Sequence, residues 1–241
     1  MNLKLIDPTF VFARSQGAVE HELVNICTID TRESSLQEAE DAFVKVKCAA
    51  ESGSPFAMCI CSRLCHTGWG TVASDANAFE WARRAADSGF APGHYELGRC
   101  YEVGIGVDKS AEEACRLYAI SSAAGFGFAA LQLAVMYHSA KLGMPDDSLA
   151  LKWAMRAYKL NEPMAPLELG RWFEQGEGVP QNESAALMWY ERASNMGNFV
   201  ASSRLSLAYA LGGLGLGTDI ELAKRYETLS LSQTQTVPDA N

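Results

Sequence analysis

Four residues in the first third of the chain have types and a spacing that could bind a metal ion, namely Cys59, Cys61, Cys65 and His66. Cysteine thiolates and histidine nitrogens are ligands that zinc prefers. On a helix Cys61 and Cys65 lie one turn apart and could reach one ion, whereas Cys59 and His66 lie on a different face. The alternative is core packing, because a free cysteine behaves as a small apolar residue. The repeat described below favours core packing, and a metal-binding or enzymatic protein centred on Cys59–His66 stays as the alternative of another class.

Other reactive residue types show no spacing typical of catalysis. The Gly-x-Gly turns at 104–106 and 176–178 follow predicted helices and lack the lysine of a phosphate-binding loop. The four histidines are scattered through the chain, and no G-x-S-x-G motif for a nucleophilic serine is present. We therefore predict that the chain is not an enzyme and has no cofactor and no metal.

Composition narrows the classes of partner and compartment. The 241 residues are 48% hydrophobic and 20% charged, as in soluble globular proteins, and the net charge of −9 argues against a uniform basic surface for nucleic acid. The start of the chain lacks the apolar core of a signal peptide, and the seven cysteines follow no disulfide framework, which predicts a cytoplasmic protein with free thiols. Serine, glycine, glutamine and histidine interrupt the uncharged stretch between Arg116 and Lys141, so we predict no membrane span.

Internal repetition is the dominant pattern. The segment ELGRCYEVGIGV (96–107) returns as ELGRWFEQGEGV (168–179), 72 residues later, which is two periods of 36. This register defines units 55–90, 91–126, 127–162, 163–198 and a shorter 199–228. Small residues recur at the third and eighth positions. Leucine or cysteine recurs at the seventh position, and an aromatic residue or cysteine at the eleventh.

Each unit has the pattern of two helices joined by a glycine turn. Leu97, Gly98 and Tyr101 share one helical face, and Gly104 follows as a helix breaker. A second amphipathic helix ends near Gly125, and neither apolar stripe can be buried unless neighbouring units stack.

The rest of the chain is placed around these units. A half-repeat at 36–54 should precede them. The segment 1–35 should hold a degenerate capping helix around residues 19–30. The polar residues 229–241 should form a disordered tail.

The repeated pattern A-x-x-x-L-G-x-x-[YF]-x-x-G-x-G-V, followed by A-x-x-[WY]-[WY], resembles the Sel1-like repeat, a relative of the tetratricopeptide repeat. The resemblance covers residues 36–228 and is fullest in units 91–126 and 163–198. The third unit departs from it, with Ala140, Leu142 and Gly143 in place of the glycine turn. The resemblance implies an all-α, right-handed solenoid that acts as a non-catalytic scaffold for a protein or peptide partner, in bacterial signalling, secretion or regulation. Neutralising a cognate toxin, as an immunity protein, is the narrower alternative.

The resemblance also implies that the first helices of the units line a concave groove. The groove residues expected to bind a partner are Arg63, His66, Tyr95, Arg99, Glu102, Phe128, His138, Arg171 and Glu174. Arginines suit carboxylates, and Tyr95 and Phe128 would be aromatic anchors. The alternative is that Arg99 and Arg171 pair along their own helices with Glu102 and Glu174. The sequence names neither the partner nor the oligomeric state.

Overall fold

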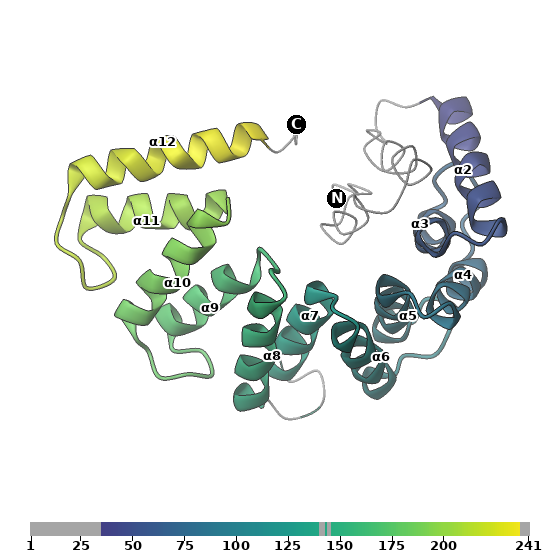
Figure 1. Cartoon of the computed structure of the whole chain (residues 1–241), viewed down its shortest axis with the longest axis horizontal. Helices are drawn as coiled ribbons and strands as arrows, with labels where there is room; N and C mark the ends of the chain where they lie inside the picture. The colour runs from purple at the N-terminus through teal and green to yellow at the C-terminus, as the bar shows by residue number, and fades with distance from the viewer. Residues whose placement is uncertain (1–34, 140–142, 144–145, 237–241) are drawn as a thin grey trace. The chain divides into compact units, whose positions relative to one another are not determined.

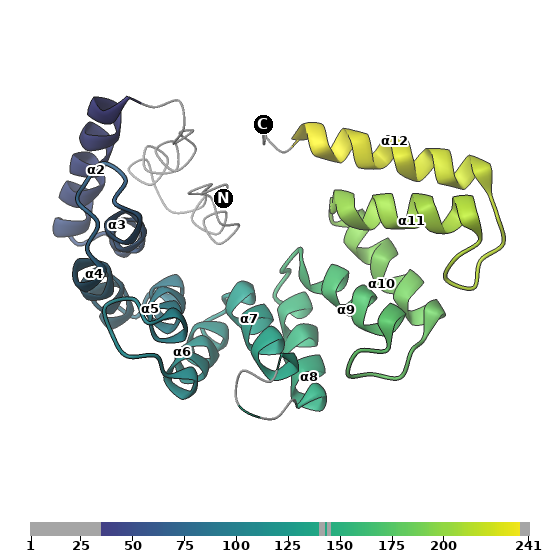
Figure 2. The same cartoon turned by 180° about the vertical axis from the view of Figure 1, so that it is seen from behind.

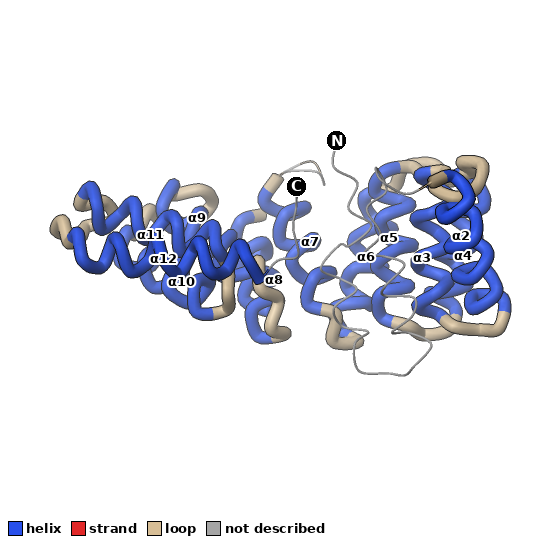
Figure 3. The backbone as a smooth tube through the Cα atoms, turned by 90° about the horizontal axis from the view of Figure 1, so that it is seen from above, coloured by secondary structure: helices blue, strands red, loops and turns tan. Residues whose placement is uncertain are grey.

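The computed structural model describes residues 35–139, 143 and 146–236, and every regular element in this part of the chain is a helix (Figure 3). The chain divides into two compact units, residues 1–129 and 130–241, and the division falls inside one helix. Each unit is a stack of helix–loop–helix hairpins. The predicted all-α repeat fold is therefore confirmed.

The first unit holds one single helix and two hairpins (Figure 1). Its helices are α2 (Leu36–Glu51), α3 (Pro55–Thr67), α4 (Asp75–Asp87), α5 (Ala91–Val103) and α6 (Ala111–Ala123). Within it α3 packs against α2, α4 and α5, so the first helices of successive repeats are neighbours. The helix α2 lies within the stretch 36–54 where a half-repeat was predicted.

The second unit continues the same order of helices (Figure 2). Its helices are α7 (Gly127–His138), in which the division falls, α8 (Asp147–Lys159), α9 (Ala165–Gln175), α10 (Glu183–Asn195), α11 (Phe199–Leu211) and α12 (Ile220–Thr236). Four first helices begin at the residue where the 36-residue register starts a unit, and α9 begins two residues later. None of the helices in the described part of the chain is both long and apolar enough to cross a membrane.

One backbone hydrogen bond closes the loop of every hairpin. The amide of the residue that caps each second helix donates to the carbonyl at the eleventh position of the repeat. Examples are Ser74 to Cys65 at 2.7 Å and Ser110 to Tyr101 at 2.9 Å. The side chain of the capping residue then accepts from the amide three residues on, which satisfies a donor left open at the helix start. This shared closure explains why hairpins of different sequence keep one shape.

Apolar burial is divided into small clusters between adjacent helices. Val46, Ile60 and Leu64 lie at the centre of one such cluster in the first unit, and Leu167 and Leu205 lie in one of the second. Many of the contacting residues are alanines with no exposed surface, which let helices approach closely. The stability of each unit therefore depends on many short interfaces between neighbours.

The C-terminal helix corrects the prediction of a disordered tail from residue 229. α12 runs to Thr236, because its polar side chains bond to earlier helices. Gln233 donates to the carbonyl of Ser194 and accepts from Ser202, and Ser230 donates to the carbonyl of Phe199. Polar composition indicated disorder here, but these residues anchor the helix. The predicted cap at 19–30, the tail beyond Thr236 and most of the divergent turn at 140–145 lie outside the described residues.

Candidate partner-binding site

The cysteine cluster lies in the core. Cys59, Cys61 and Cys65 are at most 3% exposed, so the core-packing interpretation is confirmed, and it extends to Cys59 on the other face of the helix. Burial raises the pKa of all three thiols, that of Cys61 to about 12, which opposes the thiolate form that zinc needs. His66 instead pairs with Asp75, Nδ1 to Oδ1, at 2.7 Å. Within the described residues no group of three or more histidine, cysteine or acidic side chains is placed to hold a metal ion.

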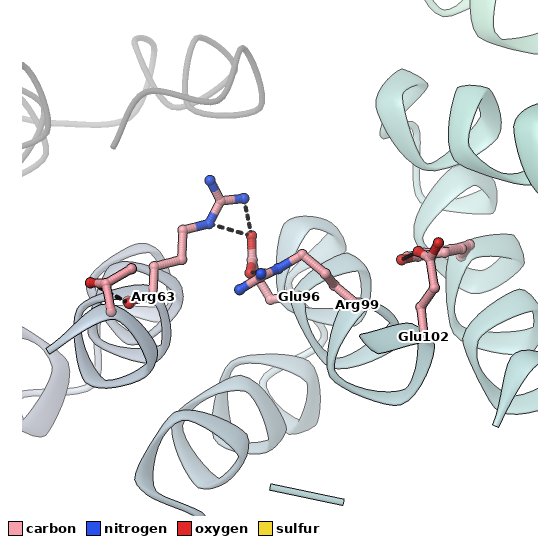
Figure 4. A network of polar contacts seen from close by, with 6 residues as sticks. Arg63, Glu96, Arg99 and Glu102 are labelled. Carbon is pink, nitrogen blue, oxygen red and sulfur yellow. Dashed lines mark hydrogen bonds and ion pairs between the residues drawn. The ribbon is translucent and has the colours of Figure 1, made fainter. Parts of the chain in front are cut away.

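In the first unit a buried carboxylate lies between two arginines (Figure 4). Glu96 of α5 is 2% exposed, and Arg63 reaches it from α3, with Nε 2.8 Å from Oε1. Arg99, one turn further along α5, places its Nε 3.2 Å from Oε2. Burial alone would raise the pKa of the Glu96 carboxyl, but the two guanidinium groups hold it below its ordinary value. The site thus joins two successive first helices through one charged group.

The arginines pair with a different glutamate from the one predicted. Arg99 bonds Glu96 rather than Glu102, and Arg171 bonds Glu168 rather than Glu174. In both helices the chosen glutamate lies three residues before the arginine, the orientation that the helix dipole favours. Arg99 is 23% exposed and Arg171 53%, so both reach the surface of a first helix.

Glu102 and Glu174 instead accept a hydrogen bond from a tyrosine of the second helix. Tyr118 donates to Glu102 at 2.7 Å, and Tyr190 donates to Glu174 at 2.6 Å. Each ring lies across a glycine of the first helix, where a Cβ at Gly98 would be 2.8 Å from the Tyr118 ring. Burial, together with the neighbouring carboxylate, raises the pKa of both phenols, which therefore stay protonated as donors.

The second unit has an ion pair between successive first helices that the sequence did not predict. Arg204 of α11 contacts Glu174 of α9, with Nε 3.0 Å from Oε1. The signal was present at the sixth position of the repeat, where Glu96, Glu168 and Arg204 are charged. Such a residue forms an ion pair with the previous first helix where that helix carries the opposite charge, as Arg63 does for Glu96 and Glu174 does for Arg204.

The aromatic anchors are less accessible than predicted. Tyr95 is 2% exposed, because its ring stacks on Tyr118 at 5.3 Å and meets the edges of Phe126 and Phe128. Phe128 is half-buried. A first helix touches helices on several sides, so its free stripe is narrower than helical periodicity suggests, and Tyr95 lies outside it.

The two predicted groove histidines have the same local arrangement. His138 pairs with Asp147 at 3.0 Å, as His66 pairs with Asp75. The His138 ring also stacks on Trp172, with centroids 4.8 Å apart, and its Nε2 lies 3.6 Å from Glu177. Of the predicted site residues, the structure brings together Arg63 with Arg99, around Glu96, and Tyr95 with Phe128. Each histidine pairs with an aspartate that was not among the predicted residues.

Comparison with known proteins agrees with this architecture. The family model described as Sel1 repeat matches residues 55–90, 91–126, 127–162, 163–198 and 200–226. The chain is 31% identical over 153 residues to the chitin synthase regulator SKT5 of Malassezia restricta, an alignment that covers 60% of this chain and 10% of that protein.

Two solved structures share the fold. A Sel1 repeat protein from Oxalobacter formigenes has a TM-score of 0.71 at 23% identity, covering 88% of this chain and 84% of that one. Immunity protein Pa5087 from Pseudomonas aeruginosa has a TM-score of 0.64 at 20% identity, covering 89% and 81%. With five matched repeats over most of its length, the chain belongs to the Sel1 repeat family.

Proposed function

We propose that this protein is a non-catalytic adaptor that binds an acidic segment of a partner protein on the first helices of its repeats. Sel1 repeat proteins are protein-interaction scaffolds, and the relatives named above are a regulator and an immunity protein. In the first unit the binding face is formed by α3 and α5, and in the second by α9 and α11.

The observation that carries the proposal is the Arg63–Glu96–Arg99 group. These three side chains together carry a charge of +1 in a chain of −9. The shared carboxylate fixes both arginines before a partner arrives, so little side-chain entropy is lost on binding. Guanidinium groups match the geometry of carboxylates, which makes an aspartate or glutamate of the partner the preferred ligand.

A narrower form of the proposal is capture of a toxin by an immunity-type protein of a bacterial cytoplasm. The bacterial immunity protein that shares the fold supports a binder of this shape. The described cysteines are free thiols, which supports a reducing compartment. Regulation of an enzyme, by analogy with the fungal chitin synthase regulator, is a second form of the proposal that uses the same binding face.

The test is affinity capture of the partner from the cells that make this protein, quantified by mass spectrometry. Arg99→Gln removes one guanidinium and leaves the Arg63–Glu96 pair in place. Arg83→Gln on α4 is the control, because it changes the net charge equally at an exposed pair with Glu80.

We expect Arg99→Gln to reduce capture at least about tenfold and Arg83→Gln to leave it unchanged, with equal helical content for both variants. Equal capture by Arg99→Gln and the unaltered protein would place the binding surface elsewhere.

A further inference from the structure

The outer face of the last hairpin has a groove of about 660 Å³ between α11 and α12. Ser203, Ser206, Leu207 and Ala210 of α11 line it, together with Ile220, Ala223, Lys224, Glu227, Ser230 and Leu231 of α12. The apolar side chains Leu207, Ile220 and Leu231 are 51%, 56% and 60% exposed. Exposed leucine and isoleucine gathered along one groove are typical of an interface.

The preceding hairpin shows what a groove at this place holds. In the hairpin of α9 and α10, Leu167 and Tyr190 pack against Leu205 of α11. The next first helix thus fills the groove of the hairpin before it. The α11–α12 groove is the counterpart one repeat later, and no described helix follows to fill it.

The occupant must differ from an ordinary first helix, because the groove of the last hairpin is charged. Lys224 and Glu227 take the places of Leu187 and Tyr190 of α10 when the capping residues Asp219 and Asn182 are aligned. Both Lys224 and Glu227 are exposed on α12. An apolar helix would bury two charges without partners, which is strongly unfavourable. The groove therefore fits a surface that offers one carboxylate and one ammonium group.

The groove residues on α12 are spaced symmetrically, so their intervals are the same when they are counted from either end of the helix. Ile220, Lys224, Glu227 and Leu231 follow one another at intervals of four, three and four residues, and so lie on one helical face. If two α12 helices cross antiparallel about a two-fold axis near residues 225–226, Lys224 of each meets Glu227 of the other. Ile220 of each then meets Leu231 of the other.

We propose that the protein forms a two-fold symmetric dimer in which the α11–α12 face of one copy packs on the same face of a second copy. Isologous interfaces of this kind need a self-complementary surface, and α12 provides one in both charge and apolar contact. The dimer face shares α11 with the partner-binding face proposed for the second unit, whereas the binding face on α3 and α5 contains none of its residues.

The test is the molar mass of the full chain in solution, measured by light scattering and by sedimentation over a range of concentrations. We expect the unaltered protein to be a dimer. Leu231→Glu should make it a monomer, and Leu36→Glu on α2, a residue 74% exposed, is the matched control that should leave the dimer unchanged.

The charge pair gives a sharper test. Lys224→Glu alone, or Glu227→Lys alone, places like charges opposite each other twice in each dimer, and should raise the dissociation constant about tenfold or more. The double exchange of Lys224→Glu with Glu227→Lys restores both pairs and should restore dimerisation. A monomer at all concentrations, or a dimer that none of these substitutions on α12 weakens, would overturn the proposal.

Discussion

The hairpins α5–α6 and α9–α10 carry the same residues at many repeat positions, yet each is linked to its neighbour in the opposite direction. In the first, Arg63 of the preceding first helix reaches Glu96. In the second, Arg204 of the following first helix reaches back to Glu174. Both links join successive first helices, but they use different positions of the repeat.

One part of the repeat is constant between the two hairpins and another part varies. The glycine beneath the tyrosine ring and the tyrosine–glutamate hydrogen bond occur in both hairpins. The surroundings of the arginine at the ninth position differ. Glu96 is 2% exposed with two arginines around it, whereas Glu168 is 21% exposed and pairs with Arg171. The packing motif is therefore common to the two hairpins, whereas the charged contacts of their first helices differ.

The largest difference between the hairpins should appear on removing the sixth-position charge. Glu96→Gln should lower the free energy of unfolding by about 3 kcal/mol, because it leaves two partly buried arginines without their carboxylate. Glu168→Gln is the matched variant and should cost about 0.5 kcal/mol or less, since Glu168 is more exposed than Glu96 and its partner Arg171 is 53% exposed. Urea unfolding followed by circular dichroism measures both. Similar losses for the two variants would contradict the contrast drawn here.

Acid should abolish the advantage of Glu96. Its pKa in the folded protein lies below the ordinary value of 4.5, so its contribution is complete from about one pH unit above 4.5 and is lost as the pH falls through the folded pKa. The gap in stability between the unaltered protein and Glu96→Gln should be constant from pH 7 to about 5.5 and shrink below that. Urea midpoints measured across this range give the gap, and one that stays constant down to pH 3 would exclude a charged Glu96 as its source.

The shared packing motif predicts equal effects in the two hairpins. Gly98→Ala and Gly170→Ala each place a methyl group within 2.8 Å of a tyrosine ring. Each should therefore cost about 1–3 kcal/mol through overpacking. The control is Ala82→Gly, which makes the same change in size in reverse at a helical site. Gly197→Ala is unsuitable, because the backbone of Gly197 is left-handed. Thermal unfolding of the variants tests the equality, and a tolerated alanine at one glycine alone would break it.

The smallest effect should separate the two tyrosines. Tyr118→Phe removes a hydrogen bond to Glu102 and should cost about 1 kcal/mol. Tyr190→Phe should cost less, since Glu174 keeps its contact with Arg204. Adding Arg204→Gln should raise the cost of Tyr190→Phe toward that of Tyr118→Phe, as a double-mutant cycle would detect. Strict additivity of the two changes would show that Arg204 does not compensate for the lost hydroxyl.

Periodicity was enough to predict the hairpins, their register and the burial of Cys61 and Cys65, because a repeated apolar face can only be buried by stacking. It was not enough to choose ion-pair partners. Glu96 and Glu102 both lie three residues from Arg99, and the tyrosine of the second helix decides between them. Periodicity also placed Tyr95 on the outer face, because it takes no account of residues outside the helix. The rings of Phe126 and Phe128, which cover Tyr95, come from beyond its own helix.

Hydrogen–deuterium exchange of the protein with and without its captured partner tests directly whether the partner binds the first helices. We predict that the partner protects backbone amides of α3 and α5, around Arg63 and Arg99, and leaves α4 and α6 unchanged. Protection confined to α4 and α6 would contradict the account, because it would place the partner on the second helices.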